Sequence, residues 1–351
     1  MTIDTAVASP ALHDDPAPLP QPRGPLTAAL LAALVRDPHR SLDLRHLLWS
    51  GEPATALADE DLQLALWLAY ELHYRGLAGV DEGWEWHPEL LWARARWEDQ
   101  LLAGLELAVP HPTDLGVDDV VRELVALADA DGGPSLAKHL MRDADVEQLR
   151  EFLVHRSIYH LKEADPHSWG IPRLSGRVKG ALITIQADEY GGGVPAGMHA
   201  QLFRTLMQDW GVDSAYGSHV DHVPGLTLLG TNVMSLFGLH RRWRGALVGH
   251  LTAIEMSSST PNARYARGHR RLGGGEAAAR FFDEHVVADA VHEQIALHDL
   301  AAGFARVEPA FAGDVVFGAR CAAHTDALLA EHVIAAWEAG RSSLRTAEVA
   351  A

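Results

Sequence analysis

Apolar residues recur at three- and four-residue steps along almost the whole chain, and this periodicity constrains the fold more than any other feature. The pattern is clearest in residues 26–37, 59–74, 88–108 and 117–130. Such spacing places the apolar side chains on one face of a helix. The one β-branched run, LITIQA at 182–187, lies inside a longer helical pattern. The sequence therefore predicts an all-α fold.

Short breaks of Pro, Gly and Asp separate the predicted helices. Asp59 is placed to cap the start of one helix, and Pro88 fits the first turn of the next. We expect one domain over residues 25–340, with scaffold helices in 25–140 and the helices that carry most of the unusual polar residues in 141–340. A disordered leader is expected over residues 1–24, which are rich in Pro, Ala and Asp, and a flexible tail over 341–351.

The charge balance limits the class of partner. The chain has 29 Lys and Arg against 47 Asp and Glu, a net charge of −18. A nucleic-acid-binding protein would show a basic face, and this charge gives no reason to expect attraction to an anionic membrane. Its one cysteine, Cys321, excludes an intramolecular disulfide and a Cys-rich zinc or iron–sulfur site. The N-terminus does not resemble a signal peptide, so a cytoplasmic protein is expected.

The segment FFDEHVVADAVHE at 281–293 carries two histidines and an aspartate at helical spacing. Offsets of four and seven residues bring His285, Asp289 and His292 within an arc of roughly 60°. Imidazole and carboxylate groups at this spacing are typical ligands of a transition metal. A solvated polar face of the helix is the alternative interpretation.

A second candidate lies where a helical pattern is interrupted. Glu189 is followed by Gly191–Gly193 and Pro195, which a regular helix would not keep, and His199 opens the next helical run. Such a break often marks a site because it changes the direction of side chains. An ordinary helix–loop–helix would give the same pattern.

A third candidate is Glu255, which continues the apolar stripe of Val248 and Leu251. A buried carboxylate needs a compensating charge, and a metal ion would supply it. A buried ion pair with an arginine within 241–244 is the alternative.

The fourth candidate is Glu163, just before Asp165–Pro166, where we expect the preceding helix to stop. Glu151, His155 and His160 lie in the same segment, and periodicity alone does not choose among them.

Taken together, four segments offer carboxylates and imidazoles without thiolates, which suits iron or manganese better than structural zinc. Six or seven ligands exceed what one ion needs, so two metals fit better than one. The Glu-x-x-His pairs of the ferritin-like carboxylate proteins do not occur here.

The chain resembles the heme-oxygenase-like diiron oxidases and oxygenases, also called iron-containing redox enzymes. The resemblance implies a heme-oxygenase-like helical bundle with an extended N-terminal helical part. It rests on KEAD (162–165), DEYGGG (188–193), His199, GALVGHLTAIE (245–255) and HVVADAVH (285–292), and extends less specifically into 71–86. The metal ligands that it implies are Glu163, Glu189, His199, Glu255, His285, Asp289 and His292.

The same resemblance implies two Fe(II) ions, or an iron–manganese pair, with O2 as co-substrate. The expected reaction is oxidation of a small organic substrate such as an amine, an amino acid or a fatty acid, with no catalytic residue beyond the ligands. An external electron donor and a homodimer are further expectations. Some relatives place a glutamate at the position of Ala196. Either Glu189 takes that role across the Gly191–Gly193 break, or one metal subsite is weak.

Three other possibilities remain open at this point, one of which is a member of the same family whose site no longer assembles iron. A heme-binding protein of the same fold would use one proximal histidine and an apolar slot, and would leave the carboxylates unexplained. A non-catalytic metal-binding helical protein would need no O2 chemistry. If the site is catalytic, Asp188, Tyr190 and Asp299 are candidates to orient the imidazoles.

Overall fold

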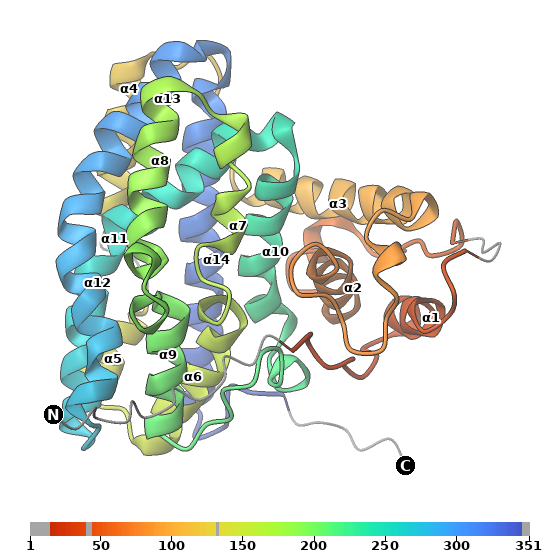
Figure 1. Ribbon diagram of the computed structural model, residues 1–351, viewed down its shortest axis with the longest axis horizontal. Helices are drawn as coiled ribbons and strands as arrows, with labels where there is room; N and C mark the ends of the chain where they lie inside the picture. The colour runs from red at the N-terminus through yellow and green to blue at the C-terminus, as the bar shows by residue number, and fades with distance from the viewer. Residues whose placement is uncertain (1–14, 40–43, 131–132, 346–351) are drawn as a thin grey trace, which may run out of the picture.

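The computed structural model describes residues 15–39, 44–130 and 133–345, and these residues form an all-α architecture (Figure 1). No β-strand occurs among them, although an isolated bridge pairs Ala17 with Leu77. The all-α prediction is therefore confirmed. The helices are α1 (Pro25–Leu34), α2 (Glu60–Glu71), α3 (Pro88–Ala108), α4 (Val117–Ala128), α5 (Leu136–Arg142), α6 (Val146–His160), α7 (Asp165–Ser168), α8 (Gly176–Glu189), α9 (His199–Asp209), α10 (Gly225–Leu239), α11 (Arg244–Arg271), α12 (Glu276–Gln294), α13 (Ala302–Val307) and α14 (Ala312–Glu338).

The predicted helix signals act as expected at both positions singled out in the sequence. The Asp59 side chain accepts a hydrogen bond from the Leu62 backbone N–H at 2.8 Å, which satisfies one free donor at the start of α2. Helix α3 begins at Pro88, where the missing backbone N–H costs nothing. The β-branched run at 182–187 lies within α8. Within the described residues, every helix is too short or too polar to cross a lipid bilayer.

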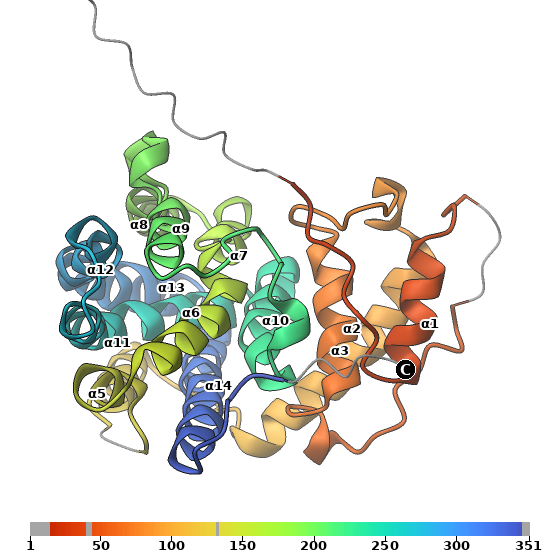
Figure 2. The same ribbon diagram turned by 90° about the horizontal axis from the view of Figure 1, so that it is seen from below.

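Helices α1–α3 lie beside a larger bundle of long helices, and α10 separates them from the rest of that bundle (Figures 1 and 2). Helix α2 packs on α10, and the apolar core continues across this contact. Helices α4 and α5 pack on α11 and α14 inside the bundle. Helices α4 and α5, which fall inside the expected scaffold part of 25–140, therefore pack within the bundle and not with α1–α3. The division of the domain near residue 140 stays a prediction.

The expected leader is shorter than residues 1–24. The Ala17 backbone N–H donates to the Gly76 carbonyl at 3.2 Å, and Ala17 itself is fully buried. Residues 15–24 thus pack against the fold because a backbone pairing and a buried side chain hold them there. Residues 1–14 lie outside the described residues.

The expected tail is likewise shorter than residues 341–351. The Ser343 backbone N–H donates to a carboxylate oxygen of Glu151 at 2.8 Å, and Ser343 is 2 % exposed. Residues 341–345 therefore belong to the packed structure. Residues 346–351 lie outside the described part of the chain.

Glycines allow the two longest helices of the bundle, α11 and α14, to approach each other closely. A Cβ atom on Gly249 of α11 would lie 1.7 Å from the Val315 carbonyl oxygen on α14. Reciprocally, a Cβ on Gly318 of α14 would lie 2.0 Å from the Ala246 carbonyl oxygen on α11. Backbone atoms cannot move aside as a flexible side chain can, so these positions fix the separation of the two helices.

The Gly249→Ala substitution is expected to lower the free energy of unfolding by about 2 kcal/mol or more, because the added methyl group forces α11 and α14 apart. Urea-induced unfolding followed by circular dichroism measures this change. Gly180→Ala on α8 is the matched control: its Cβ meets no atom within 4 Å, so it should stabilise the protein by about 0.5–1 kcal/mol through helix propensity. Equal effects of the two substitutions would contradict the packing argument.

Candidate metal centre

The seven predicted ligand residues are buried in the interior of the bundle, each at most 8 % exposed. They come from separate parts of the chain, which the fold brings together. Helix α12 supplies three of them on one face, as its spacing predicts. The contributions are Glu163 after α6, Glu189 at the end of α8, His199 at the start of α9, Glu255 on α11, and His285, Asp289 and His292 on α12.

These residues form two overlapping groups. Ligand atoms of Glu163, Glu189, His199 and His285 all lie within 4.8 Å of one another, and so do those of Glu189, Asp289 and His292. Glu189 belongs to both groups. We refer to the seven residues together as the metal cluster.

Glu255 joins the second group through His292, whose Nδ1 lies 3.2 Å from a carboxylate oxygen of Glu255. The alternative was an ion pair between Glu255 and an arginine within 241–244. Arg244, the one of these arginines closest to Glu255 in the sequence, instead binds the Glu308 carboxylate at 3.0 Å. The carboxylate on this apolar stripe therefore faces the cluster.

Glu163 lies in a turn. The sequence predicts that it lies on a helix that continues to Asp165–Pro166, and this prediction is wrong. Helix α6 ends at His160, and Ala164 adopts a left-handed conformation with φ of 73°. The His160 Nδ1–H donates to the Glu163 carboxylate at 2.7 Å, so His160 is a neighbour of the cluster that sequence reasoning did not select. His155 and Glu151 form hydrogen bonds elsewhere, to Thr227 and Ser343.

The predicted helix break between Glu189 and His199 is present and brings the two side chains together. Gly191 has φ of 63°, and a Cβ there would lie 2.4 Å from the Gly197 carbonyl carbon, so the tight loop requires glycine. Across this loop, Glu189 Oε2 lies 2.9 Å from His199 Nδ1. Ala196 is exposed on the loop. The carboxylate that reaches the cluster from this segment is therefore Glu189.

Hydrogen bonds fix the orientation of the two α12 imidazoles. The His285 Nδ1–H donates to the Phe281 carbonyl oxygen at 2.7 Å, which leaves Nε2 directed at Glu163, 3.5 Å away. The His292 Nε2–H donates to Asp188 at 2.9 Å, which leaves Nδ1 facing the cluster. A metal-binding histidine commonly donates its second ring N–H in this way.

Of the three residues expected to orient the imidazoles, only Asp188 makes such a contact among the described residues. The Tyr190 hydroxyl donates to Asp165 at 2.8 Å, and Asp299 lies 3.8 Å from Arg177. A contact that the sequence did not indicate is that of Ser258 on α11, whose hydroxyl donates to Asp289 at 2.5 Å.

The buried carboxylates of the cluster favour positive charge on the groups next to them. Burial alone would lower the pKa of His285, but the neighbouring carboxylates, Glu163 first among them, raise it to about 10. Burial also acts to lower the pKa of His292, and Glu255 and Asp188 raise it to about 9. Burial, with the charges of Glu189 and Asp289, raises the pKa of Glu255 to about 7. The carboxylates therefore favour positive charge in the centre of the site, which a bound cation would supply.

Two buried polar atoms of the cluster lack an aligned hydrogen-bond partner within the described structure: Glu163 Oε2 and His199 Nδ1. His199 Nδ1 lies 2.9 Å from Glu189 Oε2, but the two atoms are not aligned for a hydrogen bond. Two ligands of one metal ion would be arranged in this way. Buried polar atoms are normally paired, so these two indicate a missing partner. A transition-metal ion fits the donor atoms, the burial and the charge of the site.

A cavity of about 710 Å³ opens onto the metal cluster. This volume is in the range of small-molecule pockets in proteins. Aromatic and aliphatic side chains form much of its wall. Five of the seven cluster residues line it: Glu163, Glu189, Glu255, His285 and Asp289.

A family model described as iron-containing redox enzyme matches residues 150–327, just over half of the chain. The match spans all seven residues of the metal cluster and the helices that hold them. A search of curated proteins gave no significant match. The all-α bundle agrees with the heme-oxygenase-like fold expected from the sequence. The chain belongs to the family of iron-containing redox enzymes.

Proposed function

We propose that this protein is a diiron-dependent oxidoreductase that activates O2 to oxidise a small organic substrate. The proposal rests on Glu189, which belongs to both ligand groups. A carboxylate has two oxygens and can bridge two ions, as it does in dimetal sites of helical bundles.

The ligands divide between two subsites. Glu163, His199 and His285 would hold one ion, and Glu255, Asp289 and His292 the other, with Glu189 between them. Each ion would then have three ligands of its own and one that it shares. Imidazole and carboxylate ligands without thiolates favour iron.

Two bound iron ions would supply the electrons that reduce O2. The residues of the chain supply the rest of the site. The cavity holds the substrate against the cluster, and Phe203 and Phe281, both buried, keep bulk water from the His160 side of the cluster. The hydrogen bonds from His285 to Phe281 and from His292 to Asp188 hold each imidazole in the orientation that ligation requires.

Anaerobic titration with Fe(II), with metal content counted, tests the proposal directly. About two irons per chain and a transient visible absorption band on exposure to O2 are the expected results. No iron uptake, combined with tight binding of heme, would instead support the heme-binding alternative.

The His292→Ala variant is expected to lose one of the two iron ions while its helix content stays nearly unchanged, because His292 belongs to a single subsite. Metal counting after titration and far-UV circular dichroism measure the two quantities. Uptake of both ions with unaltered affinity would show that His292 is not a ligand.

A further inference from the structure

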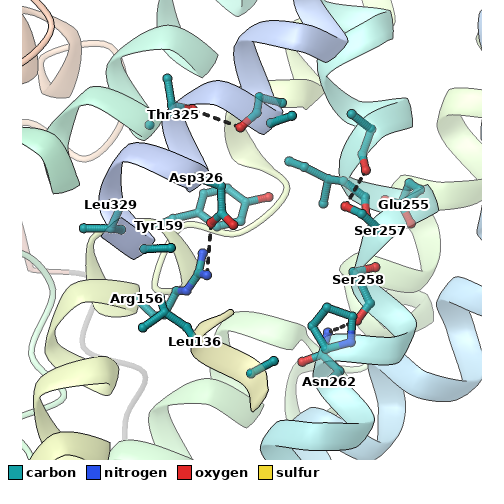
Figure 3. A pocket seen from close by; sticks show the side chains of 18 of the residues that line it. Leu136, Arg156, Tyr159, Glu255, Ser257, Ser258, Asn262, Thr325, Asp326 and Leu329 are labelled. Atoms are coloured by element: carbon teal, nitrogen blue, oxygen red, sulfur yellow. Dashed lines mark hydrogen bonds and ion pairs between the residues drawn. The ribbon is translucent and has the colours of Figure 1, made fainter. Parts of the chain in front are cut away.

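An ion pair lies in the wall of the cavity that opens onto the metal cluster. The Arg156 guanidinium on α6 lies 3.1 Å from a carboxylate oxygen of Asp326 on α14, and both residues line the cavity. Figure 3 shows this pair across the cavity from Glu255 and Ser258. The Arg156 guanidinium carbon is 5.5 Å from the centre of the Phe152 ring, a cation–π contact. The cavity therefore presents a cation and an anion side by side.

The ion pair lies within reach of the cluster. Arg156 precedes His160 by one helical turn, and His160 Nδ1 is 2.7 Å from Glu163. The backbones of Arg156 and His160 are thus separated by a rise of about 5.4 Å, and Arg156 and Glu163 line the same cavity. Phe203 and Phe281 flank His160, with ring centroids 4.9 and 5.1 Å from its ring, and also line the cavity. A molecule held at the ion pair could extend along this apolar surface to the cluster.

Both charged groups keep part of their surface open, although Arg156 also interacts with Tyr265 in the same cavity wall. The side chain of Asp326 is 60 % exposed and that of Arg156 is 24 % exposed, so neither is enclosed by their mutual contact. A guanidinium binds a carboxylate through two parallel hydrogen bonds, and a carboxylate accepts hydrogen bonds from an ammonium group.

Charge complementarity distinguishes among head groups. A simple carboxylic acid would bring a second negative charge beside Asp326, and a simple amine would bring a second positive charge beside Arg156. Like charges brought together in this way are unfavourable. An amino acid carries an ammonium and a carboxylate group on one carbon, and this zwitterion matches both members of the pair at once.

We propose that Arg156 and Asp326 recognise the zwitterionic head group of an amino acid whose side chain extends toward the metal cluster. This inference rests on the proposed function, because it assigns the occupant of the cavity as the substrate of the metal site. It names a substrate class and the two residues that select it.

Three probes of equal chain length test the proposal: L-2-aminooctanoic acid, octanoic acid and octylamine. They differ only in their charged groups. Isothermal titration calorimetry on the full-length protein measures the affinity of each probe without any need for turnover. The amino acid is expected to bind at least about tenfold more tightly than either of the others, since only it pairs with both charged residues.

Two variants identify the residues responsible. Arg156→Gln and Asp326→Asn should each weaken binding of aminooctanoic acid by about tenfold or more. Asp326→Asn should leave octanoic acid binding unchanged or stronger, because it removes a repulsive charge. Asp326 is exposed, so this variant tests the proposal even if Arg156→Gln folds poorly. Arg150→Gln, on the same helix but paired with Glu147, is the control and should bind all three probes normally.

Octanoic acid binding as tightly as the amino acid, no effect of Asp326→Asn, or no binding of any probe would each overturn the proposal. Iron titration of the same preparations separates this result from the proposed function. Normal probe selectivity without iron uptake would defeat the diiron function alone, and normal iron uptake without selectivity would defeat only the head-group assignment.

Discussion

The Glu189→Gln variant is expected to reduce iron uptake from about two ions per chain to less than about one, because it alters the one ligand that both subsites share. Glutamine keeps the size and shape of the side chain but removes the charge and one of the two acceptor oxygens. The variant therefore tests ligation with little change in packing. In contrast, His285→Ala or His292→Ala removes a ligand from one subsite only. Anaerobic Fe(II) titration with metal counting compares the three variants.

Glu284→Gln is the matched control for this experiment. Glu284 is the neighbour of His285 on α12, but its side chain is 46 % exposed and belongs to neither ligand group. Its substitution also removes one negative charge near the site, so it corrects for the loss of general electrostatic attraction to Fe(II). Two ions bound with normal affinity in Glu189→Gln would show that the two groups do not share a bridging ligand.

The helices and most of the cluster could be predicted from the sequence because they follow from local rules. The one-sided spacing of His285, Asp289 and His292 depends only on helix geometry, and the structure keeps all three on one buried face. The glycines after Glu189 likewise indicate a loop from local conformational preference alone. Where periodicity or backbone preference determines the structure, a single sequence is enough.

The end of α6 could not be predicted because it has no local signal. The turn at residues 161–164 contains no glycine, and its left-handed residue is Ala164. Alanine is unfavourable there, so tertiary contacts must hold this conformation. The apolar periodicity therefore predicted a helix that continues past Glu163. It also gave no reason to choose the hydrogen bond between His160 and Glu163 over other pairings in the segment.

Contacts between segments that are far apart in the sequence could not be predicted either. Arg156 and Asp326 are 170 residues apart, and only the packing of α6 near α14 places both in one cavity wall. The pairing of Ala17 beside Gly76 has the same origin. No composition or spacing rule selects these partners, because the free energy that favours them comes from the assembled fold.

A buried ion pair connects α2 to the turn that carries Glu163. Lys162 Nζ lies 2.8 Å from a carboxylate oxygen of Glu71, with side chains 2 % and 0 % exposed. The Tyr216 hydroxyl donates to the other oxygen of Glu71 at 2.5 Å, and the Lys162 ammonium lies 4.3 Å from the centre of the Tyr74 ring. The residue next to a proposed iron ligand is thus anchored to the scaffold helices.

The Lys162→Met substitution is expected to lower the free energy of unfolding by about 3–5 kcal/mol, because it leaves the Glu71 charge buried without its cation. Urea-induced unfolding measures the change. Lys179→Met on α8, at a half-buried position with no ion pair among the described residues, is the control and should change stability by about 0.5 kcal/mol at most.

Adding Glu71→Gln to Lys162→Met should recover most of the lost stability, because the double variant no longer buries an unpaired charge, and neutral side chains of similar size replace a buried ion pair at little cost. Iron uptake then separates two roles of the pair. If the pair only balances charge, the double variant restores stability and iron uptake together. If its geometry positions the turn, the double variant regains stability while the subsite of Glu163 stays weak. A loss below about 1 kcal/mol in the single variant would contradict both roles, since an unpaired charge at this depth would then be tolerated.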